Sequence, residues 1–523
     1  MSFRLTYATM FDPPAEMHER FDAALDQVRS RLGARHDLFL NGADVAASRH
    51  APHSSPIDSG LHLGQFAIAS EEDAAQAMKS AQRAFPAWRA TPAAERTRLM
   101  HRVADVMEAR VYEIAAALTL EVGKNRMEAL GEAQETVDFF RHYADDYAQH
   151  GGYEHELPND PLPNVVSRNR SVMRPYGAWV VIAPFNFPLA LAGGPTAAAL
   201  VTGNTVVVKG ATDTPWAGRL LADCIRDAGL PPGVFHYLSG SGREVGEALA
   251  SHPATAGITF TGSVAVGTHL LRQMASGAWP RPCIAEMGGK NPCIVTAHAN
   301  LDDAAAGIVR SAYGMDGQKC SALSRLYVDR SVADDLIERL RAQIEALRIG
   351  DPSRRENWLG PVINAHAAAN HVRYVRELQG GGATLVTGGR ELRDGELSRG
   401  HYVDPALVEA PLGHRLWKHE MFLPILMLHR VANRDEAMRL ANDSDLGLTA
   451  GFYGGVDEVP WFHEQIEAGV TYANRKQGAT TGAWPGYQPF GGWKGSGSTG
   501  KAIASFYYLA QYQREQSRTV VEP

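Results

Sequence analysis

The stretch Ala-Trp-Val-Val-Ile-Ala-Pro-Phe-Asn-Phe-Pro, residues 178–188, decides the fold. Its first six residues are all apolar and favour a buried strand, and the proline at position 188 suits the first turn of a helix. Similar strands are expected at residues 205–209, 234–238 and 257–260, with helices beginning near Pro215, Gly242 and Val264. Strands that alternate with helices at this spacing predict a parallel α/β sheet, which binds ligands at the carboxyl ends of its strands.

The same alternation continues through residues 291–485, where short strands are expected at residues 293–295, 326–328 and 383–386. This region therefore predicts a second α/β domain. Upstream, residues 71–88 and 93–122 carry the helical period. The tail, residues 507–521, is rich in Tyr, Gln and β-branched residues and is expected to form a strand that pairs outside its own domain. A chain of 523 residues is too long for one hydrophobic core, which agrees with several domains.

The composition excludes several classes of protein. The net charge is −7 without a run of like charges, so neither a nucleic acid nor a membrane surface is expected as a partner. We find neither a long apolar stretch that predicts a transmembrane helix nor the pattern of a signal peptide. Four cysteines in a chain of this length indicate reduced thiols and a cytoplasmic protein. No Cys/His cluster has zinc-ligand spacing, so no metal site is predicted.

Three polar residues stand where catalysis would need them. Cys320 follows Gly-Gln-Lys, and a loop with glycine can expose a nucleophilic thiolate. Glu286 stands among apolar residues and glycines, which raise the pKa of a carboxyl toward that of a general base. Asn186 follows the first strand, and its amide could stabilise an oxyanion. Taken singly, each has a plainer explanation: a buried inert cysteine, an exposed loop carboxylate and an asparagine that forms a turn.

Three other segments suit a dinucleotide. Lys209 ends the strand at residues 205–209, a position suited to a ribose or phosphate contact. The glycine run at residues 240–246 lacks the G-x-G-x-x-G spacing, so glycine spacing alone predicts a dinucleotide only weakly. The turn at residues 260–267 leads from a strand into a helix, where hydroxyls and amides could face a pyrophosphate.

Taken together, the order and spacing of these segments resemble the aldehyde dehydrogenase superfamily over nearly the whole chain from about residue 60. The most specific part is Glu-Met-Gly-Gly-Lys followed by Gly-Gln-Lys-Cys, which places Glu286 34 residues before Cys320. The resemblance implies that Cys320 attacks an aldehyde to form a thiohemiacetal, while the amide of Asn186 and the backbone N–H of Cys320 hold the oxyanion. Hydride transfer to a nicotinamide dinucleotide would leave a thioester, and Glu286 would activate the water that hydrolyses it.

The resemblance also implies where the dinucleotide is bound. Lys209 would contact the adenine ribose, Ser263 the pyrophosphate, and Glu420 and Phe422 the nicotinamide ribose and ring. The full set of expected cofactor residues is Ile182, Pro184, Phe185, Lys209, Thr212, Gly242, Gly246, Phe260, Ser263, Val266, Gly288, Glu420 and Phe422.

Two positions depart from the superfamily pattern. Thr212 replaces the glutamate that usually binds the adenosine ribose hydroxyls, and a neutral hydroxyl tolerates a 2′-phosphate better than a carboxylate does. We therefore expect NADP to be accepted alongside NAD. Leu423 replaces the usual glycine of Glu-x-Phe-Gly-Pro, although Glu420 and Phe422 are kept.

Within the superfamily, residues 121–125, 313–322 and 474–492 resemble the 1-pyrroline-5-carboxylate dehydrogenases, which oxidise L-glutamate γ-semialdehyde to L-glutamate. The resemblance implies that the amino and carboxylate groups of the substrate are held by a small set of residues. With the expected pocket lining included, the substrate-binding residues are Glu135, Phe187, Ser321, Gly482, Ala483 and Phe490. An asparagine usual downstream of Phe490 is absent here.

Other functions stay open at this point. The enzyme could oxidise another aliphatic or aromatic aldehyde, with Trp484 and Tyr487 in the pocket. A non-catalytic dinucleotide-binding protein would have no need of all three candidate catalytic residues. An enzyme that passes its thioester to coenzyme A usually lacks the base, here Glu286.

The expected organisation has three parts. Residues 1–150 and 172–288 would form a Rossmann-like dinucleotide-binding domain, and residues 289–500 the catalytic domain. Residues 151–171 and 501–523 would form an oligomerisation arm, because a bare strand edge in the tail needs a partner. The resemblance implies a homo-oligomer, either a dimer or an assembly of dimers.

Overall fold

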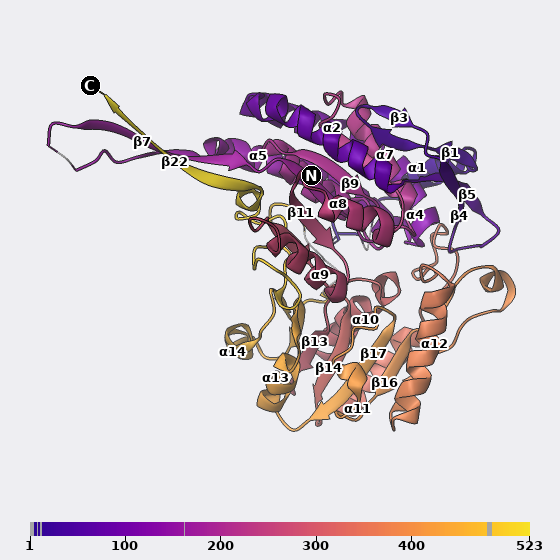
Figure 1. The fold of residues 1–523 in the computed structure, drawn as a ribbon. Coiled ribbons are helices and arrows are strands. Elements are labelled where there is room, and N and C mark those ends of the chain that lie inside the picture. Colours follow the sequence, from indigo (N-terminus) through magenta and orange to yellow (C-terminus); the bar gives the residue numbers. More distant parts are fainter. Residues whose placement is uncertain (1–4, 8, 11–12, 162, 479–483, 523) are drawn as a thin grey trace.

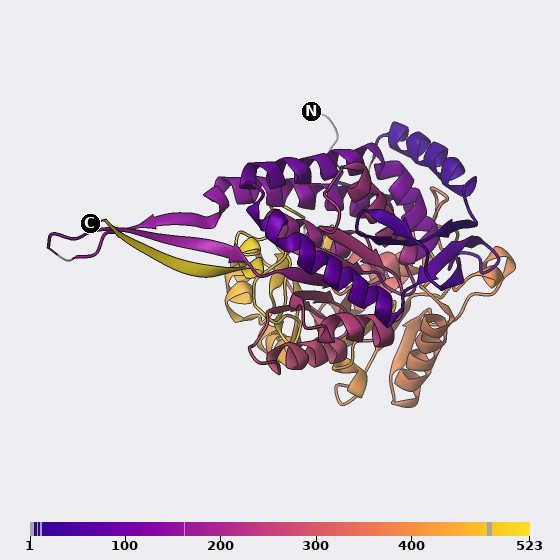
Figure 2. The same ribbon diagram turned by 45° about the horizontal axis from the view of Figure 1, so that its top comes forward.

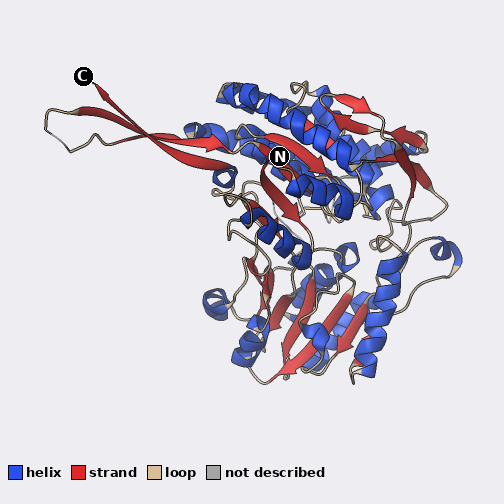
Figure 3. Cartoon of the chain, in the orientation of Figure 1, coloured by secondary structure: helices blue, strands red, loops and turns tan. Residues whose placement is uncertain are grey.

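The computed structural model describes residues 5–7, 9–10, 13–161, 163–478 and 484–522. Two large sheets lie one above the other in the view of Figure 1, each with helices packed against it, and a long arm projects from one side. Figure 3 shows the alternation of strands and helices through both halves of the molecule. This is the α/β architecture that the apolar runs predict.

The first sheet has seven strands in the order β12-β11-β8-β9-β10-β2-β3. The strands from β12 to β10 are parallel, and β2 and β3 are added antiparallel at one edge. Their bounds are β12 Cys283–Glu286, β11 Thr255–Thr261, β8 Ala178–Ile182, β9 Thr205–Lys209, β10 Phe235–Leu238, β2 Leu38–Leu40 and β3 Ala43–Val45. The four expected strands of this sheet are therefore confirmed to within two residues at each end.

Both faces of the first sheet are covered, which explains its continuous apolar runs. Val206 and Val208 of β9 enter one core, and Val207 between them enters the other. The covering helices are α2 Glu71–Ala90, α8 Glu247–Ser251 and α9 Val264–Ala275 on one face, with α3 Ala93–Ala109, α5 Arg126–Gln149, α6 Ala190–Val201 and α7 Pro215–Asp227 on the other.

Several helix boundaries differ from the expectation. The helical run at residues 93–122 divides at Arg110, whose φ of −112° and ψ of 9° separate α3 from α4 Val111–Val122. The helix expected near residue 188 begins at Ala190. The helix expected near residue 242 opens with one π-helical turn, Gly242–Gly246, before α8.

The N-terminal region adds a helix and a small sheet to this half of the molecule. Helix α1 Ala15–Arg29 packs on α4, and three short strands form a sheet in the order β1-β5-β4. The bounds of these strands are β1 Ala34–His36, β5 His62–Ile68 and β4 Arg49–Ser54.

The second sheet also has seven strands, in the order β15-β16-β17-β14-β13-β19-β20, and only the edge strand β15 is antiparallel to its neighbour. The strands are β13 Asn291–Val295, β14 Leu323–Asp329, β15 Thr384–Thr387, β16 Ala406–Glu409, β17 Ile425–Val431, β19 Thr449–Tyr453 and β20 Val470–Ala473. The helices are α10 Leu301–Tyr313, α11 Ala333–Glu345, α12 Ala365–Gly380, α13 Arg434–Asn442 and α14 Val459–Gln465. The three strands expected from the sequence lie within β13, β14 and β15 or one residue beyond.

The arm is a three-stranded antiparallel sheet in the order β22-β7-β6 (Figure 2). Strand β22, Gln513–Glu522, pairs with β7, Val166–Pro175, along its whole length, and β6, Glu154–Leu157, pairs on the other side. The tail thus forms a strand outside both large sheets, and its partner belongs to the same chain. The strand begins at Gln513 and not at residue 507, because Leu509–Tyr512 form a 3-10 turn.

One late segment ties the two sheets together. Strand β21, Trp493–Lys494, pairs with β18, Leu446–Gly447, on the side of the second sheet. A few residues on, Ser496 accepts a hydrogen bond from Met287 N at 2.9 Å, and Ser498 N donates to the carbonyl of Ala285 at 3.0 Å. The carboxyl end of β12 is therefore held by residues that lie about 200 positions later.

Within the described residues, none of the helices combines the length and the apolar character that a bilayer crossing requires.

Candidate active site

Cys320 lies on the loop between α10 and β14, and the backbone of this loop is tightly constrained. Met315 and Asp316 both take positive φ values, 52° and 55°, and Gly317 follows at 65°. A Cβ at Gly317 would lie 2.5 Å from the carbonyl oxygen of Leu423, so only glycine fits this position. The glycine before the nucleophile thus lets the loop pack against the segment that carries Glu420 and Phe422.

Asn291, the first residue of β13, fixes the other side of this loop. Its Nδ2 donates to the carbonyl oxygens of Cys320 at 2.7 Å and Ala322 at 2.8 Å, and its Oδ1 accepts from Thr449 N at 3.0 Å. The side chain is buried and uses both of its amide N–H groups on the loop. Asn291 therefore ties the nucleophile loop to the middle of the second sheet.

Cys320 differs from the other three cysteines in its exposure. Cys224, Cys283 and Cys293 are buried, whereas Cys320 is half-buried. Burial, followed by the nearby carboxyls of Glu420 and Glu286, raises the pKa of the Cys320 thiol to about 12, and the backbone amides of Ser321 and Cys320 oppose this shift. The resting thiol is therefore neutral, and its reaction requires that the proton be removed.

Glu286 ends β12 and is placed to accept a proton. Burial raises the pKa of its carboxyl to about 8, and the backbone amide of Gly492 opposes the shift in part. Its Oε2 is buried without a hydrogen-bond partner among the described residues. A carboxyl with a pKa near neutrality and an oxygen free to take a proton has the properties of a general base.

Asn186 lies four residues beyond β8 and reaches the nucleophile loop. The side chain is buried, and its Nδ2 donates to the carbonyl oxygen of Gln318 at 3.0 Å. An amide nitrogen carries two N–H groups, so one remains to donate to an oxyanion beside Cys320. The first sheet thus supplies Glu286 and Asn186, and the loop before β14 supplies Cys320.

The predicted nicotinamide contacts also come together around this loop. Oε1 of Glu420 accepts from Gly289 N at 2.8 Å, and a Cβ at Gly288 would overlap the same carboxylate. Phe422 takes a φ of 56°, and its ring meets that of Phe185 edge-on, with the centroids 5.8 Å apart. Although Leu423 replaces the usual glycine, the segment that carries Glu420 and Phe422 packs against the nucleophile loop at Gly317.

The residues predicted to bind the adenosine end of the dinucleotide lie along the carboxyl ends of the parallel strands. Ile182, Lys209 and Phe260 occupy one row, because Ile182 is in register with both of the others. Ser263 caps α9 by accepting a hydrogen bond from Val266 N at 3.4 Å, and Val266 itself is exposed. The space next to Gly242 and Gly246 is open.

Lys209 and Thr212 define the expected ribose subsite. Burial lowers the pKa of the Lys209 amine to about 8, and Asp213 opposes the shift. The Thr212 hydroxyl donates to the carbonyl of Gly240 at 3.3 Å. The predicted Pro184 lies two residues beyond β8 in the same region. An uncharged hydroxyl therefore stands where the superfamily usually has a carboxylate.

The predicted substrate residues are reached from α5 and the loop after β8. Glu135 of α5 is buried and accepts a hydrogen bond from the Tyr7 hydroxyl at 2.6 Å. Phe187 packs under Lys124, whose Nζ lies 3.6 Å from the ring centroid. Ser321 is buried beside Cys320, and Phe490 pairs with Ile503 in an isolated bridge. Gly482 and Ala483 lie outside the described residues.

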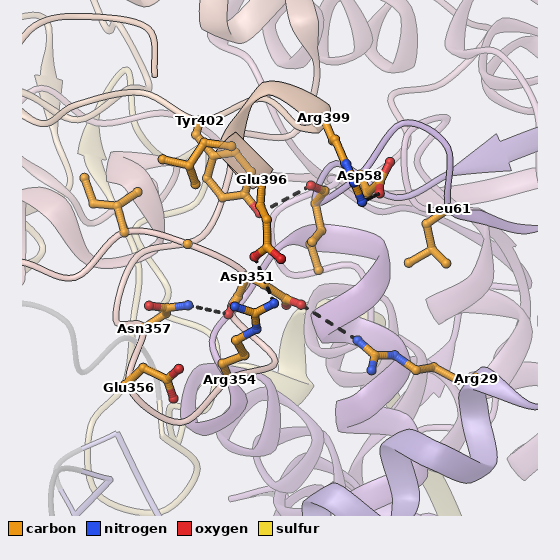
Figure 4. Close-up of a pocket in the computed structure, with 14 residues that line it drawn as sticks. Arg29, Asp58, Leu61, Asp351, Arg354, Glu356, Asn357, Glu396, Arg399 and Tyr402 are labelled. Atoms are coloured by element: carbon orange, nitrogen blue, oxygen red, sulfur yellow. Dashed lines mark hydrogen bonds and ion pairs between the residues drawn. The ribbon is translucent and has the colours of Figure 1, made fainter. Parts of the chain in front are cut away.

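A separate pocket of about 500 Å³ lies away from these residues (Figure 4). It is crossed by ion pairs between Arg29 and Asp351 at 3.8 Å, Arg354 and Glu396 at 2.9 Å, and Arg399 and Asp58 at 3.7 Å. None of the predicted site residues lines it. Because each of these arginines already has a carboxylate partner, the pocket joins the N-terminal region to the second half of the chain and offers no surplus positive charge for an anion.

A sequence model of the Aldehyde dehydrogenase family matches residues 45–517. The chain belongs to the aldehyde dehydrogenase family. The expected α/β fold and superfamily are thereby confirmed.

Known members of the family resemble the chain over nearly its full length. The 1-pyrroline-5-carboxylate dehydrogenase of Geobacillus thermodenitrificans is 35% identical over 510 residues, 96% of each chain. The 1-pyrroline-5-carboxylate dehydrogenase 1 of Halalkalibacterium halodurans is 35% identical over 512 residues, again 96% of each. The crystal structure of 1-pyrroline-5-carboxylate dehydrogenase from Thermus with bound NAD matches with a TM-score of 0.92 at 33% identity, over 99% of each chain. The chain is accordingly an NAD(P)-dependent oxidoreductase of aldehydes.

Sequence analysis of this aldehyde dehydrogenase missed a group of buried charges around the site. Lys319, next to the nucleophile, pairs with Glu128 of α5 at 2.9 Å. Lys124 pairs with Glu132, whose other oxygen accepts from Leu189 N at 2.9 Å and Ala190 N at 3.1 Å. The spacing of Glu128, Glu132 and Glu135 along one helical face was the signal that could have identified this group.

Asn291 was also missed, because an asparagine at the start of an apolar strand has no local pattern that sets it apart from a turn residue.

Proposed function

We propose that this aldehyde dehydrogenase oxidises L-glutamate γ-semialdehyde to L-glutamate. The observation that carries the proposal is that Cys320, Glu286 and Asn186 come together at one loop. Lys319 of this loop pairs with Glu128 of α5, the helix that also bears the buried carboxyl of Glu135, a group able to receive an ammonium ion. Relatives of known name support it, since two 1-pyrroline-5-carboxylate dehydrogenases are each 35% identical to the chain over 96% of its length.

The residues around the carboxyl ends of the first sheet fit a nicotinamide dinucleotide. Gly288 leaves Glu420 the space that a Cβ would fill, the turn at Gly242 and Gly246 is open, and Ser263 begins a helix whose amides can face a pyrophosphate. When bound there, the nicotinamide supplies the hydride acceptor that turns a thiohemiacetal into a thioester.

The first step joins Cys320 to the substrate. Its Sγ forms a bond to the aldehyde carbon, and the carbonyl oxygen becomes an oxyanion that receives hydrogen bonds from the Asn186 side chain and the Cys320 backbone N–H. The S–H bond breaks as this bond forms, and the carboxylate of Glu286, close enough to raise the pKa of the thiol, accepts the proton and releases it to solvent before the second half-reaction. Asn291 keeps the backbone of the attacking residue fixed, so the sulfur meets the carbon with little rearrangement.

The second half-reaction needs a base. Glu286 takes a proton from a water molecule, the hydroxide oxygen bonds to the thioester carbon, and the C–S bond breaks to release the carboxylate and the Cys320 thiol. The carboxyl of Glu286, with its pKa raised to about 8, is ionised in a growing fraction of molecules as the pH rises through neutrality.

We infer that NADP is accepted as well as NAD. The support is the neutral hydroxyl of Thr212 beside the cation of Lys209, where a 2′-phosphate would otherwise meet a carboxylate. Steady-state kinetics with each dinucleotide tests this, and a kcat/KM for NAD more than about a thousand times that for NADP would contradict it.

We also infer that the protein is a homo-oligomer joined through the arm and works in the reducing cytoplasm. Val166, Val520 and Val521 are more than half exposed on the arm, and its outer strand β6 is exposed throughout. Unpaired strand edges and exposed apolar side chains of this kind are usually covered by a partner strand or surface. Light scattering of the purified protein tests the assembly; a monomer at micromolar concentration would contradict it.

The substrate is tested by following absorbance at 340 nm with a panel of aldehydes. The panel contains L-glutamate γ-semialdehyde, succinate semialdehyde, benzaldehyde and hexanal, and Cys320→Ala serves as the inactive control. A preference for the first aldehyde supports the proposal. A preference for benzaldehyde or hexanal favours the second candidate, an enzyme for apolar aldehydes, whose support is the aromatic wall of Tyr7, Phe187 and Trp484.

A further inference from the structure

The N-terminal segment lies against the candidate substrate residues. Leu5, Tyr7 and Met10 are buried, and Tyr7 is only 4% exposed. The Tyr7 ring meets Phe187 edge-on with the centroids 6.3 Å apart, and Trp484 edge-on at 5.2 Å. Three aromatic residues separated by about 180 and about 300 positions thus form one wall.

Helix α5 has a gap in which this ring sits. A Cβ at Gly131 would lie 2.7 Å from Cε1 of Tyr7, closer than side-chain carbons approach one another. Glycine inside a helix destabilises it relative to alanine. Gly131 therefore lowers the local stability of α5 at the turn where the missing side chain leaves space for the Tyr7 ring.

The Tyr7 hydroxyl makes a specific polar contact. It donates to Oε2 of Glu135 at 2.6 Å in a buried setting. Two other carboxylates on this face of α5 have cationic partners, Lys319 for Glu128 and Lys124 for Glu132. Among the described residues Glu135 takes part in no ion pair. Burial raises the pKa of its carboxyl to about 8, and the hydrogen bond from the Tyr7 hydroxyl opposes this shift.

Trp484 is fixed to the same helix. Its Nε1 donates to Oδ2 of Asp138 at 3.0 Å, and the side chain is 1% exposed. Trp484 is thus anchored on α5 within one turn of Glu135. The phenol, the carboxylate and the indole form a continuous surface.

We propose that Tyr7 is a positioning residue for an amino-acid aldehyde. Its hydroxyl holds one oxygen of Glu135 and leaves the second to receive the ammonium group of the substrate, while its ring, with Phe187 and Trp484, forms the wall along the aliphatic chain. The proposal rests on the proposed function. A buried ammonium needs a hydrogen-bonded anionic partner, and that partner must be held still to select one substrate. The segment that carries Tyr7 therefore contributes to the substrate site.

The test compares two aldehydes in the full-length Tyr7→Phe variant. This change keeps the ring and removes only the hydroxyl. We expect kcat/KM for L-glutamate γ-semialdehyde to fall by about tenfold or more, mainly through KM, because a hydrogen bond to a charged group is lost. With hexanal, which has no ammonium group, kcat/KM should stay within about twofold.

Two further variants separate positioning from packing. Tyr374→Phe is the matched control, since Tyr374 is also buried and its hydroxyl bonds to His419 Nε2 at 2.9 Å in the other half of the molecule. It should leave the ratio of the two aldehydes unchanged. Glu135→Gln should reduce turnover of the amino-acid aldehyde as well, and adding Tyr7→Phe to it should cause little further loss, because both changes act on one contact.

The outcomes distinguish the positioning role of Tyr7 from the proposed function. If the unmodified protein prefers L-glutamate γ-semialdehyde and Tyr7→Phe lowers both aldehydes equally, or neither, the positioning role is overturned and the proposed function stands. If the unmodified protein oxidises hexanal and fails to use the amino-acid aldehyde, the proposed function and the role of Tyr7 both fall.

Discussion

Asn291→Asp is the substitution that most sharply tests how the nucleophile is held. The replacement has the same shape, but a carboxylate has no N–H to donate. The carbonyl oxygens of Cys320 and Ala322 would lose donors at 2.7 and 2.8 Å and face a negative charge instead. The acceptor for Thr449 N would remain. The change therefore acts on the nucleophile loop and spares the contact to the neighbouring strand.

The size of the effect follows from these contacts. Leaving one buried polar group unsatisfied costs about 1–3 kcal/mol. With two carbonyls affected and some relief by movement of the loop, we expect a loss of about 2–4 kcal/mol, roughly 30- to 1,000-fold in kcat/KM. The loss should appear in kcat, since Asn291 holds the attacking residue and has no predicted contact with the dinucleotide.

The assay combines turnover at 340 nm, NAD titration and thermal unfolding. Asn442→Asp is the matched control, because Asn442 also joins two backbone groups through its amide, Gln465 O at 2.8 Å and Glu467 N at 2.9 Å, at a site away from Cys320. A value of kcat/KM within about threefold of the unmodified protein would refute the reasoning. So would an equal loss in the control.

Three further predictions follow from the site. Gly288→Ala should raise the KM for NAD by about tenfold or more, because the new Cβ displaces Glu420; NAD titration checks this, and an unchanged KM contradicts it. Turnover should rise with pH as the Glu286 carboxyl ionises around its pKa of about 8 and level off above it; Glu286→Gln should accumulate acyl-enzyme and lose this rise, which pH profiles and rapid-quench measurements would show. Thr212→Glu should lower kcat/KM for NADP by about tenfold or more relative to NAD, and equal losses for the two dinucleotides would contradict the assignment.

Local sequence patterns predicted the parallel sheets well. The strands at residues 178–182 and 205–209 are buried on both faces, so their apolar runs report directly on the fold. The helix expected near residue 188 begins later, at Ala190, because Glu132 of a distant helix accepts from its first amides. The break at Arg110 likewise depends on packing between helices, which periodicity does not report.

The candidate site likewise contains residues that local sequence patterns reveal and residues that they do not. Cys320 and Glu286 could be proposed because each stands beside glycines within a few residues, and the spacing between them is typical of a family. Asn291 and Tyr7 act through contacts to residues 29 and 128 positions away, so no local pattern marks them. Glu135 was proposed from resemblance, and its buried contact with a phenol could be found only once the N-terminal segment was placed.

The backbone hydrogen bonds between the end of β12 and residues 496–498 have a consequence for how the enzyme is made. The strand that carries Glu286 is synthesised about 200 residues before the serines that fix its end. The final position of Glu286 therefore depends on a segment that is made long after the strand itself, and the base is fixed only after residues 496–498 have been added and paired.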